Sequence, residues 1–433
     1  MLKALAALAL SLTAATCAAQ TIPIADAKVA FADAQQVCAA DNGKLWGKLL
    51  CGPMIFVDPT SRFAVANQND VQGVLHARDG LFTGVLPASL PVANTATDWS
   101  GVRWTMVLWP LPQNARNRKR LLAHEMFHRI QSDLGIPLAS PQIASLDTLD
   151  GRYWLQLEWR ALATALLASS NDASTHSAQD ALAFRARRHA LFPADAASES
   201  ALNLNEGLAE YTGTKLAYDD ASAAWTVVSK IARATDTPSF VRSFAYTSGP
   251  AYALLLDRFR PSWRHEFLQS KNADLGDLLA HAIGSPANQV AAGADSRAAI
   301  YGGTALREAE VARAQQLAAK LADYRVRFVD APTLTLPNVH WNFSFDPNGL
   351  VPLPGEGTVY SPFEASDDWG TLKADAALVS GDFHELRVAA PKSSRPDDDR
   401  ILRGDGYTLT LSPQWELTPG TRAGDLSVKK KRD

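Results

Sequence analysis

Residues 117–135 read NRKRLLAHEMFHRIQSDLG, and the interpretation of the whole chain begins from this stretch. Its apolar residues recur at spacings of three and four, while its first turn is basic, as expected for a helix with one buried face. Gly135 suits the end of such a helix, because glycine adopts the left-handed conformation that many helix C-termini require. The pattern predicts an amphipathic helix over residues 117–134.

The same stretch contains His124-Glu125-Met126-Phe127-His128, in which two histidines are four residues apart. Four helical residues bring His128 to within about 40° of His124 around the axis, so both imidazoles project from one face. That geometry suits two ligands of a single zinc ion. Glu125 lies one step round the helix, where it can accept a proton from a zinc-bound water without itself binding the metal.

A catalytic zinc ion needs a third protein ligand and keeps its fourth position for water. The sequence NEGLAEY at residues 205–211 supplies the best candidate, Glu206. A rival is Glu158, within LEWRA at residues 157–161, whose alternative role is to pair with Arg160 or another cation. Gly207 permits a close helix approach that a tryptophan beside Glu158 would obstruct, which favours Glu206.

With these two motifs the chain resembles the gluzincin metallopeptidases, the peptidase superfamily of thermolysin and aminopeptidase N. In this family HExxH is followed by a glutamate ligand on a second helix, commonly within Asn-Glu-Gly-x-Ala. The resemblance implies a zincin-like catalytic domain that hydrolyses peptide bonds, with one Zn²⁺ held by His124, His128 and Glu206. It also implies that Glu125 is the general base and that Glu210 orients a histidine. The interval between the two motifs is much longer than in those enzymes, which indicates inserted helices.

A third similarity lies in FAYTSGPAY at residues 244–252. Aminopeptidase-N-like gluzincins carry Tyr-x-x-Gly before a helix, and the tyrosine hydroxyl stabilises the tetrahedral oxyanion. The resemblance gives this role to Tyr246, with Tyr211 and Tyr252 as rivals. A hydroxyl aimed at developing charge is effective because the site excludes water.

The strand expected just before the active helix, RWTMVLW at residues 103–109, is a further point of similarity. In zincins an edge strand at this place binds the substrate backbone by strand addition, and the resemblance gives residues 103–109 that role. The aminopeptidases carry Gly-x-Met-x-Asn there, which RWTMV at residues 103–107 lacks. An endopeptidase is therefore expected, and an aminopeptidase stays open as an alternative.

Around this helix the chain changes character twice, which predicts an α+β fold. Residues 20–112 are β-rich, residues 113–330 form the helical catalytic domain, and residues 331–433 form a small β-sandwich-like domain. The expected helices occupy residues 117–134, 150–169, 181–191, 205–216, 250–260 and 305–328. The expected strands occupy residues 53–57, 62–67, 73–76, 81–85, 103–109, 333–336, 340–345, 357–360, 376–379, 386–389 and 407–411.

The N-terminus predicts export. Lys3 precedes an almost wholly apolar stretch over residues 4–15, and small residues precede Gln20, a pattern typical of a secretory signal peptide at residues 1–19 cleaved near Ala19. A buried helix and a lipoprotein anchor are the alternatives. We expect a periplasmic or extracellular protein, in which Cys38 and Cys51 form a structural disulfide.

Composition narrows the remaining functions. Lys and Arg number 42 against 45 Asp and Glu in 433 residues, a net charge of -3 without the electrostatic footprint of a nucleic-acid-binding protein. After residue 20 no apolar run reaches about 18 residues, so no transmembrane span is expected in the mature chain. The sequence predicts an exported zinc peptidase acting on peptides or proteins. The alternative from another class is a non-catalytic envelope protein with a structural zinc site, which the intact Glu125 disfavours.

Overall fold

The computed structural model describes residues 22–270, 274–285, 293–345, 349–391 and 400–431. Over these residues the chain divides into two compact units, Met1–Leu306 and Arg307–Asp433. The predicted signal peptide at residues 1–19 lies outside the described residues. Among the helices of these ranges, none combines the length and apolar character that a membrane span requires.

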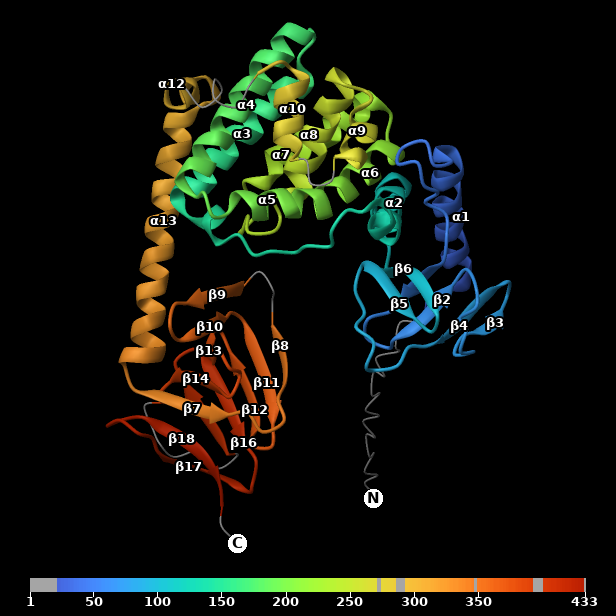
Figure 1. The fold of residues 1–433 in the computed structure, drawn as a ribbon. Helices are drawn as coiled ribbons and strands as arrows, with labels where there is room; N and C mark the ends of the chain where they lie inside the picture. Colours follow the sequence, from blue (N-terminus) through green and yellow to red (C-terminus); the bar gives the residue numbers. More distant parts are fainter. Residues whose placement is uncertain (1–21, 271–273, 286–292, 346–348, 392–399, 432–433) are drawn as a thin grey trace, which may run out of the picture. The chain divides into compact units, whose positions relative to one another are not determined.

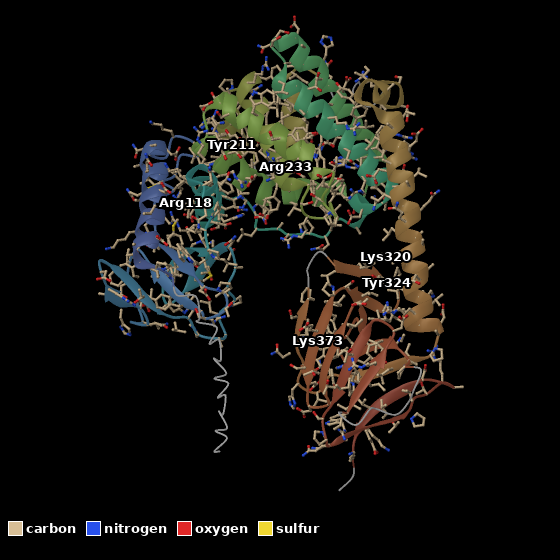
Figure 2. All side chains as sticks on the ribbon, turned by 180° about the vertical axis from the view of Figure 1, so that it is seen from behind. Arg118, Tyr211, Arg233, Lys320, Tyr324 and Lys373 are labelled. Atoms are coloured by element: carbon tan, nitrogen blue, oxygen red, sulfur yellow. A yellow bond between two sulfur atoms is a disulfide. The ribbon has the colours of Figure 1, made fainter. Side chains whose placement is uncertain are left out.

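The first unit starts with helix α1 (Ile24–Asp41), where the sequence pattern predicts only strands. Alanine, the strongest helix former, supplies much of this segment. The buried positions follow helical spacing, at Ala27, Ala30, Ala34 and Val37. Because most of these side chains are small, the apolar periodicity is weak in the sequence. Arg118 on helix α2 (Ala115–Gln131) pairs with Asp33 at 2.6 Å and joins the two helices (Figure 2).

A sheet of six strands, counted within the described residues, follows α1 (Figure 1). Across the sheet the strands are β3 (His76–Arg78), β4 (Leu81–Val85), β2 (Phe63–Ala66), β1 (Met54–Val57), β6 (Val102–Leu108) and β5 (Thr95–Trp99). The strands predicted at residues 53–57, 62–67, 81–85 and 103–109 are confirmed. The hairpin predicted around Asp79 and Gly80 is also confirmed, with both residues at positive φ between β3 and β4. Its first strand was predicted wrongly at residues 73–76, because β3 begins only at His76 and runs directly into the turn.

Strand β6 lies inside this sheet. It pairs parallel with β1 on one side and antiparallel with β5 on the other. The prediction that residues 103–109 form the edge strand is therefore wrong, and the edge beyond them is β5. The sequence of β5, TATDW, is short and partly polar, so it lacks the apolar pattern that reveals β6.

The helical part of the first unit continues from α2. Its further helices are α3 (Leu149–Leu167), α4 (Asn171–Leu191), α5 (Ala196–Leu202), α6 (Leu208–Ala217), α7 (Asp220–Ala234), α8 (Ala245–Phe259), α9 (Trp263–Gln269), α10 (Leu275–Ala282) and α12 (Ala294–Ala298). Short helical turns accompany them, η1 (Ser132–Leu134), η2 (Ala144–Asp147), η3 (Asn203–Gly207) and η4 (Ala299–Tyr301). Figure 1 shows this helical layer and the sheet of β1–β6 as the two parts of the unit, with α2 beside the sheet.

Two of these helices begin earlier than their sequences indicate. Helix α4 starts at Asn171, not at residue 181, because the Ser170 side chain accepts a hydrogen bond from the Ala173 backbone and caps the helix. Helix α8 starts at Ala245, not at residue 250, and contains Pro250 in its second turn. Tyr246 therefore lies on the first turn of α8. The described helices that were not predicted from the sequence are α1, α5, α7, α9, α10 and α12.

The second unit contains most of helix α13 (Gly303–Arg325), the turn η5 (Val326–Asp330) and two sheets within the described residues. One sheet has the order β17 (Trp415–Pro419), β18 (Leu426–Lys430), β7 (Thr333–Pro337), β14 (Glu385–Ala389), β13 (Ala377–Ser380), β10 (Gly357–Tyr360) and β9 (Leu350–Leu353). The other has the order β15 (Ile401–Gly404), β16 (Tyr407–Leu411), β12 (Gly370–Ala374), β11 (Phe363–Asp367) and β8 (Asn342–Phe345).

Both sheets of the second unit contribute to one hydrophobic core. Leu334 and Val388 come from the first sheet, and Leu372 and Leu409 from the second. This is the packing of a β-sandwich. With the N-terminal sheet and the helices between, it confirms the predicted α+β class.

The predicted disulfide joins Cys38 on α1 to Cys51, with Cα atoms 5.3 Å apart. The bond ties the last turn of α1 to the segment that enters β1. A disulfide of this kind fits an oxidising compartment.

Candidate metal centre

Helix α2 presents the two histidines as the sequence predicts. Its first turn is capped by Asn114, whose side chain accepts a hydrogen bond from the Asn117 backbone. His124, Glu125 and His128 are all buried, and their ligand atoms lie close enough to hold one metal ion. The Nε2 atoms of His124 and His128 are 3.2 Å apart.

Glu206 reaches the same point from η3, a short π-helical segment that leads into α6. Its Oε2 atom lies 3.6 Å from Nε2 of His124 and 3.6 Å from Nε2 of His128. Single π-helical turns within helices occur frequently at functional sites, because they shift one side chain relative to the helix on either side. The structure thus brings together the three side chains that the sequence proposes as ligands.

A pair of glycines permits this approach. A Cβ atom on Gly207 would lie 2.8 Å from Cα of Gly249 on α8, and one on Gly249 would lie 2.2 Å from Cα of Gly207. Real Cβ atoms do not come so close to backbone atoms, so the two segments contact each other where both lack a side chain. The contact fixes the segment that carries Glu206 against the helix that carries Tyr246.

Hydrogen bonds fix the tautomers of both histidines. His124 Nδ1 lies 3.2 Å from Glu210 Oε2, and His128 Nδ1 lies 2.8 Å from Gln131 Oε1. The Gln131 amide is itself oriented, because its Nε2 donates to the Pro137 carbonyl and to Asn205 Oδ1. Both Nδ1 atoms therefore carry a proton, and when the imidazoles are neutral both Nε2 atoms have a lone pair for a metal ion.

Two nitrogen lone pairs and a carboxylate oxygen that converge in this way fit a zinc ion. A point equidistant from the three atoms lies about 2.0 Å from each of them, which is the length of a zinc bond to histidine or carboxylate. The residues also leave one side open toward a pocket, as a catalytic site requires.

The protonation of His124 shows how strongly this point attracts positive charge. Burial opposes a charged imidazole, yet hydrogen bonds to Glu206 and Glu210 outweigh burial and raise the pKa of His124 to about 9. Burial also opposes charge on Glu206, but contacts with both histidines and Tyr246 hold its pKa below the usual range. The carboxylates thus stay ionised and favour a positive charge among them, whether the second proton of His124 or a metal ion.

A second layer of charge supports His124. Glu210, on α6, accepts hydrogen bonds from Arg120 and, at 2.8 Å, from Lys230 on α7. Burial raises the pKa of the Glu210 carboxyl, but its contacts with His124 and these cations outweigh burial and lower the pKa to about 2. Glu210 is therefore an ionised acceptor for His124 Nδ1, in the position that the resemblance implies.

Glu125 lies beside His124, and one of its oxygens has no hydrogen-bond partner within the described ranges. Its Oε1 lies 4.0 Å from His124 Nε2, while Oε2 is buried and has no hydrogen-bond partner among the described residues. Burial raises the pKa of Glu125. A buried carboxylate oxygen without a donor is costly unless a water or a substrate group supplies one.

Tyr246 faces the same point. Its hydroxyl donates to Glu206 Oε2 at 2.6 Å, and its ring is parallel to the His124 ring with centroids 5.7 Å apart. The rivals have other partners. Tyr211 donates to Asp257 inside the helical layer (Figure 2), and Tyr252 donates to Glu158 at 2.9 Å.

Glu158 lies apart from the histidines. It is buried on α3 and accepts a hydrogen bond from Arg188 at 2.5 Å. Arg160, the cation expected to pair with it, instead donates to the Tyr301 carbonyl at 2.7 Å. The structure brings Glu206, and not Glu158, to His124 and His128.

A pocket of about 390 Å³ opens over these residues. Besides the residues already described, its wall includes Asn94, Thr95, Leu121, Leu138 and Arg242. Thr95 is the first residue of the edge strand β5, and Asn94 immediately precedes it. The edge of the sheet therefore borders the pocket. Arg242 Nη2 lies 3.9 Å from Glu206 Oε1.

Several residues of the site were not predicted from the sequence. Gln131 lies three positions after His128, on the same face of the helix. This spacing could have predicted the hydrogen bond between the two side chains. Lys230 and Arg242 come from segments whose relation to α2 no local pattern reveals.

Comparison of the chain with known protein families, with curated proteins and with solved structures finds no match. The interpretation of the site therefore rests on its own geometry.

Proposed function

We propose that this protein is an exported zinc-dependent peptidase of the gluzincin type. The observation that carries the proposal is the convergence of His124 Nε2, His128 Nε2 and Glu206 Oε2, with a free oxygen of Glu125 beside them. His124, His128 and Glu206 are the proposed ligands of one Zn²⁺. The pocket of about 390 Å³ over them has room for a short stretch of peptide.

Zinc at such a site polarises a carbonyl and lowers the pKa of water. Glu125 then acts as general base, taking a proton from the attacking water on its free oxygen and later giving it to the leaving amine. Tyr246 donates its hydroxyl to the oxyanion after leaving Glu206 Oε2.

Strand β5 is the proposed support for the substrate backbone. It is the free edge of the sheet, and residues 94 and 95 line the pocket. An extended peptide added to this edge would lie beside the pocket, and its backbone would pair with the outward-facing groups of β5.

Two features support an endopeptidase over the alternatives. A structural zinc site closes with a fourth protein ligand, whereas here the three proposed ligands border an open pocket. An aminopeptidase needs a spare acidic group to hold the substrate amine. In the described pocket wall, the acidic residues are Glu125, Glu206 and Glu210, and each already has another role.

Export follows from the N-terminal pattern of residues 1–19 and is supported by the Cys38–Cys51 disulfide. We propose a periplasmic or extracellular location for the mature protein.

The proposal is tested with purified zinc-loaded protein on casein and on internally quenched peptides. We expect Glu125→Gln to lower kcat by about 10²- to 10⁴-fold while zinc content stays at one ion per chain. Glu266→Gln, on α9 outside the pocket, is the control for loss of a carboxylate and keeps the wild-type rate. Equal activity of wild type and Glu125→Gln, or absence of bound zinc, contradicts the proposal.

A further inference from the structure

Arg242 lies at the mouth of the pocket, on a turn whose backbone is anchored. It lies in the turn that precedes α8, one helical turn before Tyr246. The turn is anchored by Phe240, whose backbone donates to Asp147 Oδ1 at 2.7 Å and whose buried ring packs against Trp159. The anchored turn fixes where the side chain begins, while the half-exposed guanidinium can reorient toward a ligand.

The cations of the pocket differ in what they already bind. Arg120 and Lys230 both donate to Glu210. Arg242 has a half-exposed side chain, and its nearest carboxylate oxygen is Glu206 Oε1 at 3.9 Å, too far for a hydrogen bond. In the described part of the chain its guanidinium makes no hydrogen bond.

Charge in the pocket favours an anionic ligand. The wall has three carboxylates, Glu125, Glu206 and Glu210, and three cations, Arg120, Lys230 and Arg242. With neutral histidines these charges balance. A divalent ion held as in the proposed function leaves an excess of positive charge, and the guanidinium of Arg242 is the donor group still free to neutralise it.

The direction of Arg242 separates it from the reacting atoms. Glu206 turns Oε2 toward the histidines and Tyr246, and Oε1 toward Arg242. Arg242 therefore borders the far side of the Glu206 carboxylate. A group bound there belongs to a part of the substrate next to the scissile bond.

We propose that Arg242 binds a carboxylate of the substrate, so that the site prefers peptides with an acidic side chain or a free C-terminus close to the scissile bond. The planar guanidinium presents paired donors that match a carboxylate in both spacing and charge. This inference rests on the proposed function and names its substrate class.

A set of three peptides tests the inference and distinguishes the two sources of the carboxylate. One peptide has a central glutamate and an amidated C-terminus, the second has glutamine in its place, and the third is the glutamine peptide shortened to a free C-terminus. We measure kcat/KM on the wild-type protein, and affinity by calorimetry on zinc-loaded Glu125→Gln, which retains peptides without cutting them.

We expect at least one carboxylate peptide to exceed the neutral peptide by about ten- to a hundredfold in both measurements. In Arg242→Gln this ratio falls to within about threefold of unity, and Arg242→Lys keeps part of it. Arg233→Gln is the matched control. Arg233 is exposed at the end of α7 and absent from the pocket wall (Figure 2), so its loss retains the ratio while removing the same charge.

Equal values for the three peptides on the wild-type protein overturn the inference, as does a ratio that Arg242→Gln leaves unchanged. Both results leave the peptidase proposal intact if Glu125→Gln is inactive. If the wild-type protein cuts no peptide, the proposed function fails, and the calorimetric ratio still decides whether Arg242 binds carboxylates.

Discussion

Two buried groups of charge lie in the helical part of the first unit, and they differ in what neutralises their carboxylates. In one group, which we call the arginine cluster, Arg188 binds Glu158 at 2.5 Å and Glu199 at 2.7 and 3.0 Å. All three side chains are only 1% exposed. Tyr252 and His189 supply the remaining hydrogen bonds to the two glutamates.

In the other group, the histidine cluster, Glu206 and Glu210 face His124 and His128 at the base of a pocket. Two imidazole lone pairs converge there, and Glu125 keeps a buried oxygen without a donor. In the arginine cluster both carboxylates are hydrogen-bonded to Arg188. The histidine cluster could hold a metal ion, and we propose that this difference separates a structural group of charges from a functional one.

The largest expected effect is on stability, at the arginine cluster. Arg188→Met leaves Glu158 and Glu199 buried without their guanidinium, and we expect it to lower the free energy of unfolding by about 3–5 kcal/mol. Urea denaturation measures this change. Arg187→Met, at the exposed neighbouring position of α4, is expected to change it by less than about 1 kcal/mol. Similar losses in both variants would show that the cluster is not a structural unit.

The second prediction compares Glu206 and Glu158 as candidates for the third zinc ligand. We expect Glu206→Gln to weaken zinc binding by at least about a hundredfold, because it removes a ligand, and Glu158→Gln to leave the zinc affinity within about threefold. Competition against a chelator of known affinity measures both. The opposite order would assign the third ligand to Glu158 and refute the comparison.

A smaller effect is expected at the contact between Gly207 and Gly249, which lies beside Glu206. In Gly249→Ala the new methyl group would lie 2.2 Å from Cα of Gly207, so α8 and η3 must separate. We expect a loss of about 1–3 kcal/mol in unfolding free energy and weaker zinc binding. Gly381→Ala, whose methyl group meets no atom within 4 Å, serves as control. Unchanged zinc binding in a folded Gly249→Ala protein would show that the close contact does not position Glu206.

The smallest expected effect is a pH dependence at Glu199. Burial raises its pKa, but Arg188 and His189 outweigh burial and depress the pKa below its ordinary value of 4.5. A depressed carboxyl pKa stabilises the fold above about pH 4.5, and this contribution is lost as the pH falls further.

We therefore expect the unfolding free energy of the wild-type protein to decrease below pH 5. The slope in Glu199→Gln should be shallower by up to about 1 kcal/mol per pH unit. Urea denaturation between pH 6 and pH 3 gives both slopes, with Asp236→Asn, exposed in a loop, as the control. Identical slopes in wild type and Glu199→Gln would contradict a depressed pKa at Glu199.

Much of the fold was predictable where one local pattern dominates. The helix of residues 115–131, the strands β1, β2, β4 and β6 and the disulfide follow from apolar spacing, turn residues and cysteine number. Helix α1 was missed because its buried face consists largely of alanines. Strand β5 was missed because its partner, and not its own residues, makes it a strand.

The sequence by itself determined that the imidazoles of His124 and His128 project from the same face of one helix. Their four-residue spacing on one helix places them on one face regardless of the rest of the chain, since helix geometry is local. It also placed Glu125 beside them and supplied Glu206 and Tyr246 as candidates.

Only the tertiary structure decided which carboxylate meets those imidazoles and which is paired with arginine. Glu158 and Glu206 are both buried glutamates of helical segments, and their local sequences do not state their partners. The contact of Gly207 with Gly249 positions Glu206 beside the two histidines, whereas Glu158 accepts a hydrogen bond from Arg188. Such choices depend on side chains far apart in the sequence, because the energy of a buried charge is set by its nearest counter-charge and not by its neighbours along the chain.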